Sequence, residues 1–472
     1  MTRTLAALCL GVVLAGCAVT QPKPPVLDLP EPTATAEQNA LLERWWIAFD
    51  DPVLTALIEE AYANNLDLKA ALARIDLARA GLLQAQSNLY PTVSLNAGAT
   101  RSRLSQIIVP PSDPPTTPSV TNDLSIGLQA SYEIDVWGKY RAGSLAAQND
   151  VVAAQYDRES VRITVSANVA RGYFQLRAAD ALLVIYVDTA KTRAETVQLQ
   201  RDRFEGGLIG EYDLRQAEAE LSAVQADIAR AQQAVALTES ALATLTGRSP
   251  RAVFTPMIAR GNSIEAATSA PQLPSGLPSG LMQRRPDIRR SEADLAAADL
   301  RIQQARTNYF PTISLTGAYG FEGTSLANLF TGPAAAWSLG LALVQPLFSL
   351  KSIEAGVLAA EARRDAVTVQ YQQIVQNAFR EVHDALSTND SAQRVLAAES
   401  ARREQLRQAL AVANLRYEAG RTSYLEVLDA QRTLLASETL RIAAARDARF
   451  SIVDFAKALG GGWQTESVAS IQ

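Results

Sequence analysis

Residues Asp123–Arg141 read DLSIGLQASYEIDVWGKYR, and this stretch decides the fold. Apolar residues occupy every second position from Leu124 to Val136, and polar or small residues stand between them. A period of two predicts a β-strand with one apolar face and one polar face. After Gly138 the pattern changes to that of a long, alanine-rich helix. We therefore expect an extended strand that leads directly into a very long helix.

The same arrangement occurs twice in the chain. Residues Tyr90–Leu95 (YPTVSL) return as Phe310–Leu315 (FPTISL), 220 positions later. Residues Arg203–Gly207 (RFEGG) return as Arg416–Gly420 (RYEAG), 213 positions later. Matching elements at one large offset indicate an internal duplication. The difference of seven residues is expected in the Pro/Ser/Thr-rich loop at 105–122, because loops tolerate insertions.

Helical periodicity and breakers predict where the elements of each repeat lie. Repeat 1 covers 51–247, with helices, a β-hairpin at about 91–137 and long helices at about 139–204 and 211–246. After a Pro-, Gly- and Ser-rich linker at 248–280, repeat 2 covers 281–462, with a helix, a hairpin at about 311–348 and long helices at about 351–417 and 422–459, before a tail at 463–472. The first long helix would measure on the order of 95 Å. Such a length is typical of a coiled coil or a bundle wall.

The N-terminus has the features of a secreted lipoprotein. Residues 1–16 combine Arg3 with an apolar stretch that is too short to span a bilayer, which predicts a signal peptide. The stretch ends Leu14-Ala15-Gly16-Cys17 and resembles the lipobox of bacterial lipoproteins, in which the cysteine is acylated. We expect Cys17 to carry the lipid, including palmitate, and residues 17–50 to form a lipidated, proline-rich strap. Apart from this lipid, we expect no cofactor.

Composition excludes several classes of function. The chain has 472 residues and a net charge of −5, which gives no reason to expect nucleic-acid binding. One histidine and two cysteines argue against Cys/His metal clusters and a disulfide framework. No nucleophile constellation or phosphate loop is present. We therefore expect no enzymatic activity.

The four predicted strands point to a membrane barrel made by several chains. Apolar/polar alternation over about ten residues is the signature of an outer-membrane barrel strand. Four strands cannot close a barrel, and an open edge in lipid leaves backbone groups without partners. Three chains would give twelve strands. The long helices carry charged residues throughout, so they would continue the wall outside the membrane. A soluble two-sheet sandwich with helical stalks is the alternative.

Several motifs resemble outer membrane factors of the TolC type, in their lipoprotein (OprM/NodT-like) branch, which serve tripartite efflux systems. The resemblance covers nearly the whole mature chain. The motifs that carry it are Trp45-Trp46 with Phe49, Asp51-Pro52 and Leu54; Asn65-Leu66-Asp67-Leu68; Tyr90-Pro91; Tyr132–Gly138; Leu277-Pro278-Ser279 through Arg284-Arg285-Pro286-Asp287-Ile288; and Tyr424–Gln431.

The resemblance implies a homotrimer with a twelve-stranded β-barrel in the bacterial outer membrane, four strands per chain, and a long α-helical barrel in the periplasm. It implies passive export of drugs or other small compounds. The partners would be an inner-membrane transporter, of the RND type, and a periplasmic adaptor (membrane fusion protein). The exported substrate cannot be read from the sequence.

The resemblance also implies functional residues near the ends of the long helices. Leu425 and Asp429, four apart on one helix face, would form an apolar ring and a carboxylate ring that close the periplasmic mouth. By their residues alone, Leu425 would pack between helices and Asp429 would face solvent. The two helix–helix turns would be adaptor-contacting tips, or simply helix C-caps, and the residues concerned are Arg203, Gly207, Leu208, Arg416, Gly420 and Arg421.

Two other functions compete with drug efflux. A conduit for type I protein secretion has the same architecture, and only Cys17 and the OprM-like motifs favour the efflux branch. A lipid-anchored structural scaffold would not conduct ions and would not need polar residues on one strand face. The polar residues Thr92, Ser125, Gln129 and Ser131 therefore count against the scaffold.

Overall fold

The computed structural model describes residues 43–103, 105, 120–266 and 285–462. Several sequence predictions lie outside these ranges: the signal peptide, the lipidated Cys17, most of the strap at 17–50, the second part (267–280) of the linker at 248–280, the motif at 277–279 and the tail at 463–472.

The chain divides into two compact units, and these do not follow the two repeats. Unit 1 consists of residues 1–25, 76–153 and 292–370, and unit 2 of residues 26–75, 154–291 and 371–472. Each unit therefore combines segments of both repeats. The reason is physical: strands of both repeats share one hydrogen-bonded sheet, and helices of both repeats share one apolar core.

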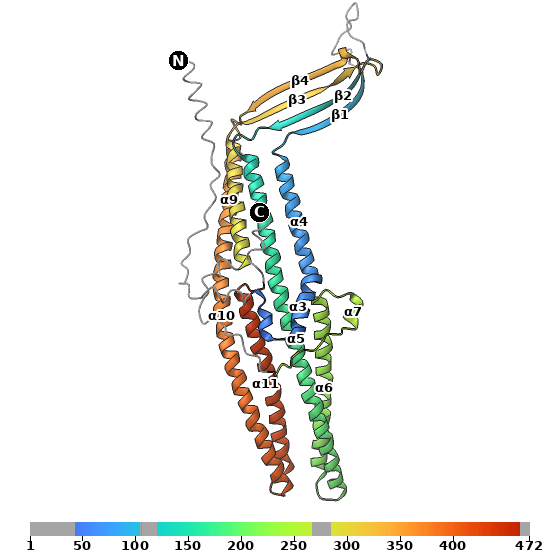
Figure 1. Cartoon of the computed structure of the whole chain (residues 1–472), viewed down its shortest axis with the longest axis vertical. Coiled ribbons are helices and arrows are strands. Elements are labelled where there is room, and N and C mark those ends of the chain that lie inside the picture. The colour runs from blue at the N-terminus through green and yellow to red at the C-terminus, as the bar shows by residue number, and fades with distance from the viewer. Residues whose placement is uncertain (1–42, 104, 106–119, 267–284, 463–472) are drawn as a thin grey trace, which may run out of the picture. The chain divides into compact units, whose positions relative to one another are not determined.

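Unit 1 contains a four-stranded antiparallel sheet (Figure 1). Its strands are β1 (Thr92–Arg103), β2 (Val120–Glu133), β3 (Thr312–Gly323) and β4 (Ala335–Val344). They lie in chain order, so the two hairpins join through the β2–β3 pair. Within the described residues, β1 and β4 each pair with one strand only, and both edges of the sheet are open.

The strand register places apolar residues on one face of the whole sheet. Leu95 pairs with Leu128, Leu128 with Tyr319, and Tyr319 with Trp337, so these four side chains share a face. All four are at least half exposed in the single chain. The opposite face is polar or small, with Asn96, Gln129, Ser314 and Glu322 among its residues. The alternation seen in the sequence therefore gives two chemically different surfaces.

The strand β2 ends earlier than its sequence pattern predicts. The alternation runs to Val136, but the strand ends at Glu133, and the last bond toward β3 is donated by the Ile134 N–H to the Ile313 carbonyl, at 2.8 Å. Gly138 then has φ +77°, a left-handed conformation that glycine adopts readily. This turn redirects the chain into the helix that begins at Lys139.

The helices that follow each hairpin are very long. α5 runs from Lys139 to Glu205 and α10 from Leu350 to Glu418. Each is followed by a 35-residue helix, α6 (Glu211–Leu245) or α11 (Tyr424–Ala458). These bounds lie within about two residues of the sequence prediction. The remaining helices are η2 (Trp45–Phe49), α3 (Pro52–Asn64), α4 (Leu66–Ser87), α7 (Pro250–Phe254), α9 (Pro286–Arg306), η3 (Thr307–Tyr309) and η4 (Gly332–Ala334).

The short helix α7 corrects the sequence analysis, which expects only irregular structure between 248 and 280. The Ser249 side chain accepts a hydrogen bond from the Ala252 N–H and caps α7, and Pro250 occupies its first turn. Both are favourable at a helix start.

The core of unit 2 is built around the segment that precedes α3. Trp45, Trp46 and Phe49 are buried against α5, where Phe49 packs on Phe174 with ring centroids 4.8 Å apart. The Asp51 carboxylate caps α3 by accepting from the Val53 and Leu54 N–H groups at 2.9 and 3.2 Å. This cap satisfies two of the backbone N–H donors that a helix start leaves free.

Candidate functional site

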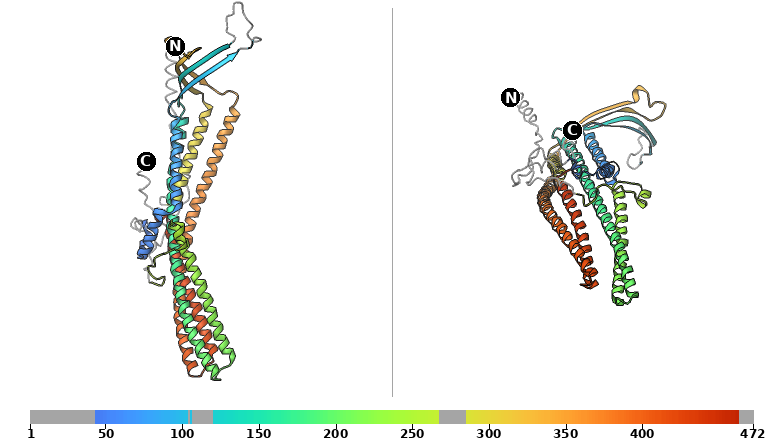
Figure 2. Two further views of the ribbon diagram at one scale, coloured as in Figure 1. Left: turned by 90° about the vertical axis from the view of Figure 1, so that its right-hand side faces the viewer. Right: turned by 60° about the horizontal axis from the view of Figure 1, so that its bottom comes forward.

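Two turns at the same end of unit 2 form the tips of the long helices (Figures 1 and 2). In the first turn, the Leu208 N–H donates to the Arg203 carbonyl at 2.8 Å, and Gly207 has φ +69°. In the second, the Arg421 N–H donates to the Arg416 carbonyl at 2.8 Å, and Gly420 has φ +67°. Both turns are Schellman-type C-caps that require a left-handed residue. The internal duplication is therefore visible even in the hydrogen bonds of the two turns, which are the same in both repeats.

The predicted tip residues differ in their surroundings. Leu208 is 77% exposed, and Gly207, Gly420 and Arg421 are also exposed. Arg203 is half-buried, and its guanidinium bonds the Tyr417 hydroxyl at 2.5 Å across the two turns. The exposed residues are accessible to a partner, whereas Arg203 joins the two helix pairs.

Arg416, another of the three predicted tip arginines, is also engaged within the chain. The Arg416 guanidinium forms an ion pair with Glu426 at 2.8 Å, on the first turn of α11. Glu426 also accepts from the Thr422 hydroxyl. Arg416 is therefore exposed and paired with the start of α11 within the chain.

The two predicted gate residues lie on the exposed side of α11. Leu425 is 56% exposed, and Asp429, one turn further along, is exposed as well. The opposite side of the helix buries Tyr424, Val427 and Leu428 in a small apolar cluster with residues of α5, α6 and α10. In the single chain Leu425 therefore lies outside this cluster, in contrast to the alternative from sequence alone, whereas the exposed Asp429 agrees with that alternative. Their role as a gate stays a prediction.

A partly buried ion cluster near these residues was missed by the sequence analysis. Glu220 on α6 is 8% exposed and bonds two arginines: Arg193 of α5, at 2.8 Å, and Arg432 of α11, with a Nε–Oε1 distance of 2.8 Å. Arg193 also donates to the Glu220 carbonyl at 2.7 Å. We call these three residues the Glu220 clamp. Its sequence signal is a lone carboxylate within the buried stripe of α6, between Ala217 and Val224.

Other kinds of site are not seen in the part of the chain that the structure describes. No group of three or more His, Cys, Asp or Glu side chains is placed to hold a metal ion. Among the described residues, no helix is both long and apolar enough to cross a membrane. His383 is 83% exposed at its side chain and lies beside Asp384.

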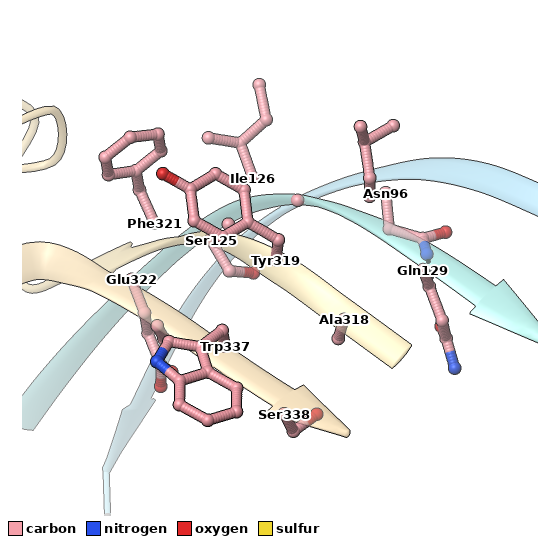
Figure 3. A pocket seen from close by; sticks show the side chains of 14 residues that line it. Asn96, Ser125, Ile126, Gln129, Ala318, Tyr319, Phe321, Glu322, Trp337 and Ser338 are labelled. Carbon is pink, nitrogen blue, oxygen red and sulfur yellow. Dashed lines mark hydrogen bonds between the residues drawn. The ribbon is translucent and has the colours of Figure 1, made fainter. Parts of the chain in front are cut away.

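The sheet carries a shallow hollow of about 310 Å³ (Figure 3). Its lining includes residues of both faces: Tyr319 and Phe321 point to one side of the strands, and Gln129 and Glu322 to the other. A small-molecule site has a few polar groups that converge on one enclosed space. This hollow lacks that arrangement, so we assign it no ligand.

Comparison with known proteins identifies the family. The family model described as outer membrane efflux protein matches residues 57–248 and 277–461, which is most of the chain. The chain belongs to the outer membrane efflux protein family. The resemblance drawn from the sequence motifs is thereby confirmed.

Individual relatives agree with this assignment. The chain is 32% identical over 415 residues to the solvent efflux pump outer membrane protein SrpC of Pseudomonas putida, which covers 88% of this chain and 86% of that protein. It is 30% identical to the "Probable outer membrane lipoprotein SilC" of Salmonella typhimurium, covering 96% of this chain and 97% of the relative.

A solved structure shows the same fold. The CmeC outer membrane channel of Campylobacter jejuni matches with a TM-score of 0.85 and 28% identity, over 95% of this chain and 97% of that one. The protein is therefore an efflux protein of the bacterial outer membrane, with the fold of an outer-membrane channel. These relatives are pump components and channels, in agreement with the expectation that the chain is not an enzyme.

Proposed function

We propose that three copies of this chain form the exit duct of a tripartite efflux system. The observation that carries this proposal is the sheet of unit 1, which, within the described residues, has two open edges and one exposed, mainly apolar face. Such a sheet is unstable in lipid as a single chain, because its edge groups lack partners. Pairing β4 of one copy with β1 of the next closes a twelve-stranded barrel with the apolar face toward lipid and the polar face toward the lumen.

The gate is proposed at Leu425 and Asp429. Both side chains are exposed on the same side of α11 in the single chain. On a three-fold axis, Leu425 would form an apolar constriction and Asp429 a ring of three carboxylates, which repel one another or bind cations. The Glu220 clamp would hold α11 against α5 and α6 while this ring is closed.

The remaining partners follow from the same proposal. A periplasmic adaptor would contact the tips at Gly207, Leu208, Gly420 and Arg421, and an RND-type inner-membrane transporter would drive export through the adaptor. Drugs or other small compounds would pass through the duct passively. A lipid on Cys17 would anchor the chain in the outer membrane, as the name of the SilC relative suggests for that protein. No other cofactor is proposed.

Single-channel conductance in planar bilayers tests the duct and its gate together. We expect the wild-type protein to open rarely, and the Leu425→Ala/Asp429→Ala variant to stay open for much longer. A Leu440→Ala variant, which changes another exposed leucine on α11, is the matched control. No conductance from any variant with confirmed insertion would refute the duct and favour a lipid-anchored scaffold. Equal conductance from all three would keep the duct and place the gate elsewhere.

A duct for type I protein secretion is the second candidate. It has the same architecture, so conductance does not separate the two. A gene deletion separates the two functions when drug susceptibility and secreted proteins are both measured. Efflux predicts lower drug resistance with an unchanged set of secreted proteins. Secretion predicts unchanged resistance and the loss of a secreted protein.

A further inference from the structure

The apolar face of the sheet carries two charged residues at one end of β1. Along this strand the residues on the apolar face are Val93, Leu95, Ala97, Ala99, Arg101 and Arg103. On the same face of β2, β3 and β4, the register places apolar or small residues, with Asn122 as the polar exception. Within the described strands, Arg101 and Arg103 are therefore the only charges on this face.

The two arginines lie at the end of the strand that is far from the helices. Helix α4 leads into β1 at Thr92, and Arg103 is the last residue of the strand. The helices of an outer-membrane efflux protein extend into the periplasm. In the proposed barrel, on which this inference rests, Arg101 and Arg103 therefore lie toward the outer leaflet.

The length of β1 places both residues at the outer boundary of the membrane. Arg103 lies ten positions after Val93 in β1, which is about 33 Å along a strand. With a strand tilt of about 40°, the rise along the membrane normal is about 25 Å, which equals the usual height of the apolar band. Arg101 is about 5 Å lower. Charged side chains on the lipid face are costly at mid-depth and tolerated near the interface, which agrees with this placement.

Both guanidinium groups are available to an external anion. Arg101 and Arg103 are exposed, and neither has an ion-pair partner among the described residues. In the barrel, the next copy contributes β4, whose residues on this face are Ala335, Trp337, Leu339, Leu341 and Leu343. That strand supplies no carboxylate. The described strands therefore supply no counter-charge for these arginines on this face.

We propose that Arg101 and Arg103 bind the phosphate groups of glycolipids in the outer leaflet. Guanidinium groups bind phosphate through two parallel hydrogen bonds, and long arginine side chains extend from apolar surface to the headgroup level. Two arginines two positions apart on one strand face are about 6.6 Å from each other along the strand, within reach of one diphosphorylated headgroup. The barrel thereby has a fixed depth in the outer leaflet.

Native mass spectrometry of the detergent-solubilised trimer tests this site, with diphosphoryl lipid A as the probe. We expect Arg101→Gln/Arg103→Gln to weaken binding about tenfold or more, because charge-assisted hydrogen bonds are lost. Arg101→Lys/Arg103→Lys keeps the charge without the paired hydrogen bonds, so its affinity for lipid A should lie between those of the wild type and the glutamine variant.

A matched control moves the charges to the other face of the same strand. Adding Thr100→Arg and Ser102→Arg to the glutamine variant restores the net charge, and the register turns these positions toward the lumen. We expect this variant to bind as weakly as the glutamine variant. Recovery of wild-type affinity would show non-specific attraction and overturn the site.

Further outcomes separate this proposal from the duct. Wild-type affinity in the glutamine variant, with conductance intact, would overturn the lipid site and leave the duct standing. Displacement of lipid A by millimolar inorganic phosphate would assign the arginines to free anions and overturn the lipid assignment. A wild-type protein that neither inserts nor conducts would refute the duct, and the lipid site with it.

Discussion

Replacing Glu220 with Gln should raise the open probability of the duct without changing its single-channel conductance. The substitution keeps the shape of the side chain and removes the charge that Arg193 and Arg432 share. Arg193 is the decisive partner because its side chain is only 7% exposed, whereas that of Arg432 is 48% exposed. Exposed ion pairs contribute little to stability, but a buried arginine that loses its carboxylate is costly.

The size of the effect follows from the contacts that remain. Arg193 keeps its hydrogen bond to the carbonyl of residue 220, so the loss is that of one charge-assisted hydrogen bond and not of the whole interaction. Such a bond contributes about 1.5–3 kcal/mol. If the clamp exists only in the closed state, the closed-to-open equilibrium shifts toward open by roughly 10- to 150-fold.

Single-channel recording measures this shift as open probability. Glu218→Gln is the matched control, because Glu218 lies on the same helix and pairs with Arg201 and Arg215 at the exposed surface. We expect that control to behave as the wild type. An unchanged open probability for Glu220→Gln, with a lower melting temperature of the trimer, would show that the clamp only stabilises the fold and would refute its link to opening.

Three further predictions concern assembly and stability. Gly320→Ala places a methyl group against the backbone of β2 and should cost about 1–3 kcal/mol, lowering the yield of inserted protein, whereas Gly317→Ala meets only ordinary contacts and should insert normally. In Gly261→Ala the added methyl group overlaps the Asp51 carboxylate that caps α3. This should reduce the free energy of unfolding by a similar amount and lower the melting temperature of the purified protein. Burial raises the pKa of the Glu159 carboxyl above its unfolded value, so its ionisation destabilises the fold as pH rises above about 4.5. Glu159→Gln should therefore raise the melting temperature at pH 8 and change it little at pH 4, and an equal effect at both pH values would contradict this explanation.

The sequence predicts elements well where one periodicity runs without interruption. The alternation before Gly138 and the proline-free stretch after it are local signals, so the strand and helix they predict lie close to those in the structure. The exception is the end of β2, where the alternation continues past the last paired residue. Pairing depends on a partner strand, which the alternation of one strand does not encode.

The clamp shows what sequence patterns leave out. Leu425 and Asp429 were reached through the resemblance, and the structure adds which side of α11 they occupy. Arg193, Glu220 and Arg432 lie on three helices, and their meeting depends on how those helices pack. A charged residue within an apolar stripe signals a buried partner, but the identity of that partner is a tertiary property.

The open edges of the sheet have a consequence for genetics. In the proposed trimer, each edge strand pairs with an edge strand of another copy, so every barrel contains three independently synthesised chains. If a closed but assembly-competent variant is made in equal amount with the wild type, only about one eighth of the trimers contain wild-type chains alone. Substitutions that spare β1 and β4 but block opening should therefore be dominant, whereas substitutions that destroy an edge should be recessive, because those chains never enter a barrel.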